Sequence, residues 1–140
     1  MNTKTLLAGL VGGVVAFLLG WLLYGILLLD FMKANTNQCM NLDMKDMNMV
    51  TMIISNLLWG LLLALILGWA NVTSFMGGLM KGAMYGILLA LAFDLQFSSM
   101  TTYFNNMNAM IADVAVTTVM NALVGGVVGW MLGRGSSAAA

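Results

Sequence analysis

The sequence has few of the residue types on which metalloproteins and disulfide-stabilised proteins depend. It contains no histidine and a single cysteine, Cys39, among 140 residues. Without histidine the common zinc and haem ligand sets cannot be assembled within this chain, and one cysteine excludes an internal disulfide. The composition therefore argues against redox metalloenzymes of the usual kinds, and we expect no cofactor.

Charged residues are also scarce. They make up 7% of the chain, whereas 61% of its residues are hydrophobic. Soluble domains contain about a quarter charged residues, so this composition predicts an integral membrane protein surrounded by the lipid bilayer. The formal net charge is zero, which provides no basic surface for nucleic acid, and we expect no nucleic-acid partner.

Four long apolar segments predict an all-α bundle of transmembrane helices, since a span needs about 20 apolar residues. The expected spans are residues 5–30, 50–70, 77–95 and 109–133. They form one transmembrane domain, residues 1–134, and residues 135–140 read as a disordered tail or a cloning scar. The first segment exceeds the apolar region of a signal peptide, about 7 to 15 residues, and therefore reads as a retained span.

Small residues recur at every fourth position of each span. Residues four apart share a helix face, and in lipid such faces let two helix backbones pack closely. These glycine-zipper faces predict homo-oligomers or association with partner membrane subunits, because four thin spans offer more packing surface than one bundle can bury. The small residues are Ala8, Gly12, Ala16 and Gly20, then Gly60, Ala64 and Gly68, then Gly78, Gly82, Gly86 and Ala90, and finally Gly125, Gly129 and Gly133.

An internal repeat relates the two halves of the chain. Residues 56–68 align with residues 121–133 and preserve their polar and glycine positions, while residues 24–28 recur as residues 85–89. The pattern predicts a duplicated two-helix hairpin, with both copies in the same orientation because each crosses the membrane twice. Chance recurrence of Leu, Gly and Ala in an apolar protein is the alternative interpretation.

One face of the fourth span combines polar residues with glycines, which have no side chain. Asp113, Thr117 and Asn121 lie one turn apart, and glycines continue the same face. A carboxyl group at this depth should avoid lipid, because burial disfavours its charged form unless hydroxyls, amides or water support it. The stripe indicates a half-channel or a buried hydrogen-bonded seam, with Asp113 expected near Asp94 or the second outer loop.

Other polar residues extend this candidate path, which comprises Asp113, Thr117, Asn121, Asn56 and Asp94. Acids at membrane depth often mark ion pathways, although for Asp30 and Asp94 we favour the interpretation of ordinary helix-end positions at the interface. Buried amides such as Asn56 and Asn121 most often join helices by hydrogen bonds, which is the interpretation we favour for them.

Methionines gather around the first outer loop. Cys39, Met40, Met44 and Met47 offer soft sulfur ligands that select Cu(I), and Met-x-x-x-Met on a short interfacial helix would present two sulfurs to one ion. Methionine also serves as a flexible apolar filler. Nearly half of the 15 methionines lie well outside this cluster, which favours the filler interpretation and the absence of a metal.

The first span carries a short resemblance. Residues 20–25, Gly-Trp-Leu-Leu-Tyr-Gly, followed by Leu27, Leu28 and the exit at Lys33, resemble the opening of an uncharacterised bacterial family of small four-span inner-membrane proteins. This chain departs from the family by lacking its proline after the tyrosine. The resemblance covers about fifteen residues, and it implies a four-helix inner-membrane protein without supplying an activity.

These features predict an oligomeric transporter or channel-like protein for a small solute or ion. The alternative is a non-catalytic membrane scaffold or accessory subunit, and the third possibility is Cu(I) handling through the outer loop. We expect no enzyme activity and no catalytic residues, because no nucleophile, base or metal set stands at a workable spacing.

The positions of Lys and Arg predict the orientation in the bacterial inner membrane. Lys4, Lys81 and Arg134 fall on one side, against Lys33 and Lys45 on the other, so both termini should be cytoplasmic. An impermeant thiol reagent applied to intact cells should therefore label Cys39.

The matched measurement uses a second position on the opposite side. A cysteine placed at Asn71, with Cys39 protected, should stay unlabelled because the connector between the second and third spans faces the cytoplasm. Labelling at Asn71 would reverse the assignment.

Overall fold

The computed structural model describes residues 2–134, apart from the side chain of Met44, so the expected tail at residues 135–140 lies outside the described residues. Its regular elements are helices, and four are long and apolar enough to cross a membrane. These are α1 (Thr3–Leu22) with its continuation to Leu27, α3 (Met49–Trp69), α4 (Phe75–Met100) and α5 (Met107–Gly133). The predicted all-helical class with four membrane-length helices is confirmed, and it defines a multi-pass membrane protein.

Each long helix begins at a polar capping residue. The cap side chain accepts a hydrogen bond from the backbone N–H three residues further along, which satisfies one of the free donors of the first turn. The capping residues are Asn2 for α1, Asn48 for α3, Ser74 for α4 and Asn106 for α5. These short polar side chains fix where each helix starts, at the edge of its apolar segment.

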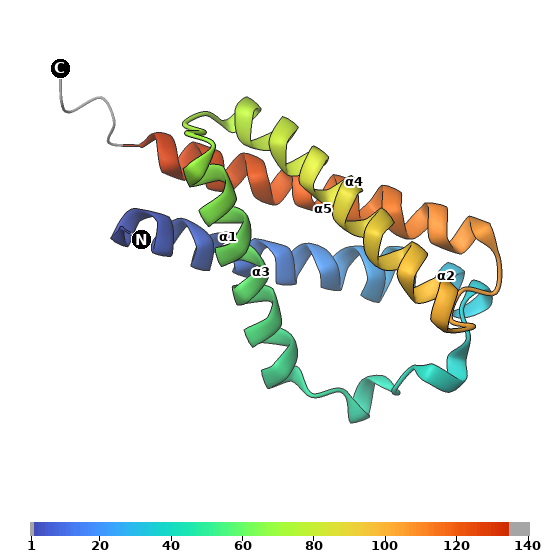
Figure 1. Cartoon of the computed structure of the whole chain (residues 1–140). Coiled ribbons are helices and arrows are strands. Elements are labelled where there is room, and N and C mark those ends of the chain that lie inside the picture. Colours follow the sequence, from blue (N-terminus) through green and yellow to red (C-terminus); the bar gives the residue numbers. More distant parts are fainter. Residues whose placement is uncertain (1, 135–140) are drawn as a thin grey trace, which may run out of the picture.

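The four long helices do not form a symmetric bundle. Figure 1 shows α4 and α5 side by side along their length, with α1 next to α5 and α3 crossing α1 at a steep angle. Both ends of the described chain lie at one end of the molecule, together with the 70–74 connector. The 101–106 loop and the short helix α2 (Leu29–Asn35) lie at the other end, which we call the outer end.

The first span is interrupted by a wide helical turn. Leu23–Leu27 form a π-helix, whose register is seen where the N–H of Leu28 bonds to the carbonyl of Leu23 at 2.8 Å. A π-turn places an extra residue in one turn of helix, and such turns are frequent at functional sites. The sequence predicts one uninterrupted segment over residues 5–30, whereas the structure divides it into α1, this turn and α2.

Glycines bring α4 and α5 into backbone contact. A methyl group at Gly82 would lie 3.1 Å from the Cα of Gly125, and one at Gly86 would lie 3.1 Å from the Cα of Thr118. Gly78 likewise faces the backbone of Gly125 and Gly129. In lipid, where apolar side chains gain little by leaving their surroundings, such close packing holds helices together.

The contact between α1 and α3 uses glycines outside the predicted stripe of α1. A methyl group at Gly13 would lie 2.6 Å from the Cα of Leu57, and one at Gly9 would lie 2.8 Å from the Cα of Leu61. Gly12 instead meets the side chain of Val128 in α5. Gly20 makes no close backbone contact in the described chain, since a methyl group there would lie 3.9 Å from its nearest neighbour, the Sδ of Met120, and its packing role stays a prediction.

The two hairpins pack in different registers. Gly125 of α5 meets Gly78 and Gly82, which the internal repeat aligns with positions 17 and 21 of the first span. Gly60, the repeat partner of Gly125, meets Gly9 and Gly13 instead. The helix packing therefore does not reproduce the sequence repeat, and the duplication stays a prediction.

Two glycines of α3 provide a matched test of this packing. Gly60→Ala should lower the stability in detergent by about 1–3 kcal/mol, because its methyl group meets the backbone of α1. Gly68→Ala places its methyl group 3.8 Å from the Oγ1 of Thr5, so it should be neutral or stabilising by up to about 1 kcal/mol. Thermal unfolding of both variants measures the difference, and equal effects would contradict the contact.

Candidate functional site

A cavity of about 250 Å³ lies between α1, α3, α4 and α5, and we call it the inner cavity. All five polar residues predicted from the sequence line it, although they come from three helices. They are Asn56 of α3, Asp94 of α4, and Asp113, Thr117 and Asn121 of α5. The rest of the wall is formed mainly by apolar and aromatic side chains. The cavity thus has a polar side and an apolar side.

Asp94 is the most buried acid at this site. Its side chain is 8% exposed, and within residues 2–134 its Oδ2 atom has no hydrogen-bond partner. Asp113 lines the same cavity, so the two acids lie near one another, as the sequence predicts. No lysine or arginine stands among the described residues that line the inner cavity. The two carboxyl groups therefore share a site without a basic partner.

Tyr24 joins the π-turn to α5. Its hydroxyl donates a hydrogen bond to the carbonyl oxygen of Asp113 at 3.4 Å and shares another with the Oγ1 of Thr117 at 3.0 Å. Sequence reasoning did not assign Tyr24 to the site, although Tyr24 continues the small-residue face of the first span. This link between two helices supports the backbone from which the Asp113 carboxyl group projects.

The two amides do not join helices through their nitrogen atoms. The Nδ2 of Asn56 donates to the carbonyl of Met52 at 2.8 Å, and the Nδ2 of Asn121 donates to the carbonyl of Thr117 at 2.9 Å. Both bonds stay within one helix, so the favoured interpretation of interhelical bonds was wrong for the described chain. A membrane helix offers its carbonyls one turn back, and each amide bonds there instead.

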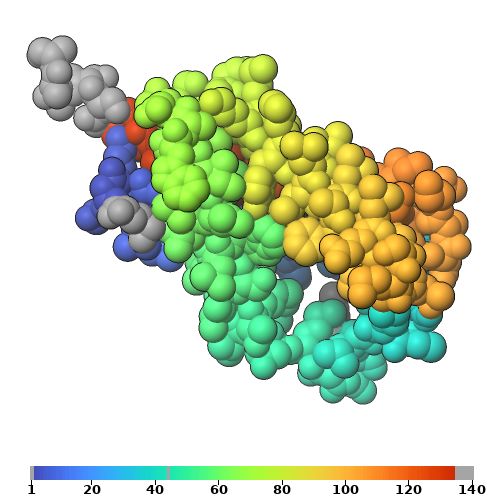
Figure 2. Space-filling view, in the orientation of Figure 1, coloured from blue at the N-terminus to red at the C-terminus, as the bar shows by residue number. Residues whose placement is uncertain are grey.

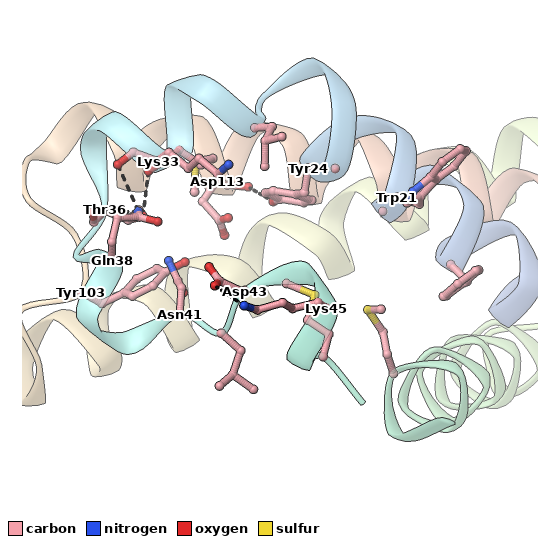
Figure 3. Close-up of a pocket in the computed structure, with 18 of the residues that line it drawn as sticks. Trp21, Tyr24, Lys33, Thr36, Gln38, Asn41, Asp43, Lys45, Tyr103 and Asp113 are labelled. Carbon is pink, nitrogen blue, oxygen red and sulfur yellow. Dashed lines mark hydrogen bonds and ion pairs between the residues drawn. The ribbon is translucent and has the colours of Figure 1, made fainter. Parts of the chain in front are cut away.

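A larger cavity of about 740 Å³ opens towards the outer end, and we call it the outer cavity. Asn56 and Asp113 line both cavities, so the two spaces adjoin at these residues. Figure 2 shows the molecule hollowed between the outer ends of α3 and α4 and the 36–48 loop. In Figure 3 the Asp113 carboxyl group points into this space, across from Asp43 and Lys45 of the loop.

Two outer segments, distant in sequence, pair beside this cavity. Thr36 and Phe104 form an isolated antiparallel bridge, in which the N–H of Asn37 donates to the carbonyl of Tyr103 at 2.7 Å. The Nδ2 of Asn106 also donates to the Oδ1 of Asn35 at 2.6 Å. The sequence alone does not predict this pairing. The pairing ties the two hairpins together at the outer end.

Tyr103 lies on the wall of the outer cavity within this paired segment. Its ring makes edge contacts with Phe97 and Phe104, at centroid separations of 5.8 and 5.0 Å. Burial raises the pKa of the Tyr103 hydroxyl, and the nearby charge of Asp113 adds to the effect, although hydrogen bonding with Thr36 opposes it. The hydroxyl therefore stays protonated, as a potential hydrogen-bond donor, throughout the physiological pH range.

The methionine-rich loop does not form the expected interfacial helix. Two separate 3₁₀ turns, Gln38–Met40 and Met44–Asp46, replace it, so Met40 and Met47 do not share a helix face. Cys39, Met40 and Met47 are exposed, and the side chain of Met44 lies outside the described residues. Short polar residues between the methionines favour turns over a continuous helix. The arrangement removes the geometric reason for pairing sulfurs on one copper ion.

Comparison with known proteins adds no further assignment. No protein-family model matches the chain, and no similar curated protein and no similar solved structure was found. The fold and cavities define a multi-pass membrane protein with a polar site inside its helices, and its function has to be inferred from that site.

Two tyrosines test the hydrogen bonds of the site. Tyr24→Phe should lower the stability by about 0.5–1.5 kcal/mol, because it removes the bonds to Asp113 and Thr117. Tyr85→Phe should be neutral or stabilising, because the buried hydroxyl of Tyr85 has no partner within the described chain. Unfolding of both variants in the same detergent measures the contrast. A larger loss for Tyr85→Phe than for Tyr24→Phe would contradict these assignments.

Proposed function

We propose that this protein is a small transporter or channel-like protein of the bacterial inner membrane that moves a small solute or ion. One observation carries the proposal. Polar side chains from α3, α4 and α5 line an inner cavity that adjoins a wider outer cavity at Asn56 and Asp113. Polar residues at membrane depth are expensive to maintain, and they commonly mark the route of an ion or solute.

The route is open at one end only. The outer cavity reaches the 36–48 loop, with Lys33 and Lys45 among the residues that line it. Beyond Asn121, towards the cytoplasmic end proposed here, the glycines of α4 and α5 bring the two backbones into contact. A solute that enters from outside would therefore stop at the inner cavity. This arrangement favours a half-channel or an outward-facing transporter, whose closed end opens by separation of α4 and α5.

Assembly and orientation complete the proposal. We propose that the protein works as a homo-oligomer or with partner membrane subunits, with both termini cytoplasmic. Large apolar side chains on all four long helices are exposed, which provides surface for lipid and for neighbouring subunits. The resemblance of residues 20–25 to small four-span proteins agrees with a compact membrane protein of this kind.

The alternative function is a non-catalytic scaffold or accessory subunit. The close backbone contacts at Gly60, Gly78 and Gly82 favour it, because small-residue faces also build stable complexes without any transport. In that case the polar groups form an enclosed seam that water does not enter. Copper handling is the weakest candidate, because Met40 and Met47 lie outside any common helix.

Water access to α5 separates transport from scaffolding. In a Cys39→Ser background, Thr117→Cys should react with a small impermeant thiol reagent added from outside, because Thr117 lines the inner cavity. The matched control is Val119→Cys. Val119 is 54% exposed, on a face of the same helix that would contact lipid. It should stay unreacted, because a thiolate does not form in hydrocarbon.

The two cysteines together give a clear outcome. Reaction at position 117 without reaction at position 119 supports a wet path. Failure of position 117 to react, in protein that is correctly inserted, would favour the scaffold.

A further inference from the structure

We propose that the inner cavity binds a hydrophobic organic cation, namely a substituted ammonium with an aromatic or aliphatic body. This inference rests on the proposed function and assigns it a substrate class. The cation would lie beside Asp94 and Asp113, and the apolar body would lie against Trp59 and Phe93. All four residues line the same cavity of about 250 Å³.

The charge of the ligand follows from the acids. Asp94 is 8% exposed, and its Oδ2 atom has no partner in the described chain. Asp113 adds a second carboxyl group to the same cavity, and no described basic residue lines it. A buried carboxylate without a partner is costly, and a bound cation would supply the missing interaction. An anion or a strong hydrogen-bond acceptor would meet repulsion here.

The neutral polar groups also present oxygen atoms. The Nδ2 atoms of Asn56 and Asn121 each donate one of their two N–H groups to a carbonyl of their own helix, and each Oδ1 can accept a hydrogen bond from a ligand. Both residues line the cavity beside Thr117, whose hydroxyl is held by Tyr24. The polar residues of the cavity thus offer oxygen acceptors to a ligand with N–H or polarised C–H groups.

The apolar side distinguishes an organic cation from a metal ion. Leu63, Leu89 and Val124 line the cavity together with two aromatic rings, so most of its wall cannot coordinate a metal. Hard metal ions need six to eight oxygen ligands around a small site, whereas this cavity is wide. Aromatic faces attract organic cations and are the usual means of binding quaternary ammonium groups.

The rings of Trp59 and Phe93 also suggest a lateral entrance from lipid, in addition to the route through the outer cavity. They meet edge to face at a centroid separation of 6.4 Å, in a contact between α3 and α4. Trp59 is 39% exposed and Phe93 is 56% exposed, on a surface that would face lipid. Figure 1 shows α3 and α4 separating beyond this level towards the outer end. A cation dissolved at the bilayer surface would reach the acids by displacing this single aromatic contact.

Binding to the purified full-length protein in detergent tests the inference. The probe is benzyltrimethylammonium chloride, followed by calorimetry, with its uncharged isostere neopentylbenzene as the comparison ligand. We expect saturable binding of the cation and no competition from the isostere. Asp94→Asn keeps the shape and removes the charge, so it should weaken binding about tenfold or more. Trp59→Leu should weaken it about fivefold through loss of the aromatic face.

The matched control is Asp30→Asn, which removes an exposed carboxyl group of α2 and should leave binding unchanged. Absence of saturable binding, or an equal loss in Asp30→Asn and Asp94→Asn, would overturn the inference. Binding of sodium or calcium chloride without binding of the probe would also overturn it. Reaction at Thr117→Cys without cation binding refutes the substrate class alone, whereas cation binding without that reaction refutes the transport path alone.

Discussion

The close approach of α4 to α5 is the constraint on which the rest of this structure depends. Glycines on both helices bring their backbones together, with Gly82 against Gly125 and Gly86 against Thr118. This contact fixes the register of two antiparallel helices. Two turns further along α4 the chain reaches Asp94, at the level where α5 presents Asp113, and both acids line one cavity. Packing by the smallest residues thereby sets the position of the most polar ones.

The interior divides into a tightly packed half and a polar, hollow half. The packed half stabilises the protein by close contact, since helices in lipid gain little from apolar burial alone. The hollow half holds Asp94 without a hydrogen-bond partner in the described chain. Native proteins usually leave a buried polar group without a partner only at functional sites, and they compensate for the lost stability elsewhere. The glycine contacts provide that compensation here, and Tyr24 adds a bond between the π-turn and α5.

The outer end is organised by contacts between distant parts of the chain. The bridge between Thr36 and Phe104 joins the two hairpins, and the 36–48 loop closes one side of the outer cavity. The π-turn at Leu23–Leu27 lets the first helix reach this loop through α2. α3 leaves α1 at a steep angle (Figure 1), and the outer cavity lies between these two helices and the 36–48 loop. Asymmetry between the hairpins thus creates the space for a site.

Helix class, the four long helices and the polar stripe of α5 follow from local chemistry, and the sequence predicts them. An apolar segment of about 20 residues must form a helix in lipid, because every backbone polar group must be bonded within it. The fourfold spacing then places Asp113, Thr117 and Asn121 on one face. The same reasoning grouped Asn56 and Asp94 with them as a candidate path, and all five line the inner cavity.

The tertiary structure alone assigned the remaining features. These features join positions far apart in sequence. They are the hydrogen bond of Tyr24 to α5, the pairing of the outer loops, and the contact of Gly9 and Gly13 with α3. Spacing reveals which residues share a helix face, but it does not reveal which neighbour that face meets. Crossing angle and register decide that, and they depend on side-chain fit summed over whole helices. For this reason similar sequence repeats pack differently in the two hairpins.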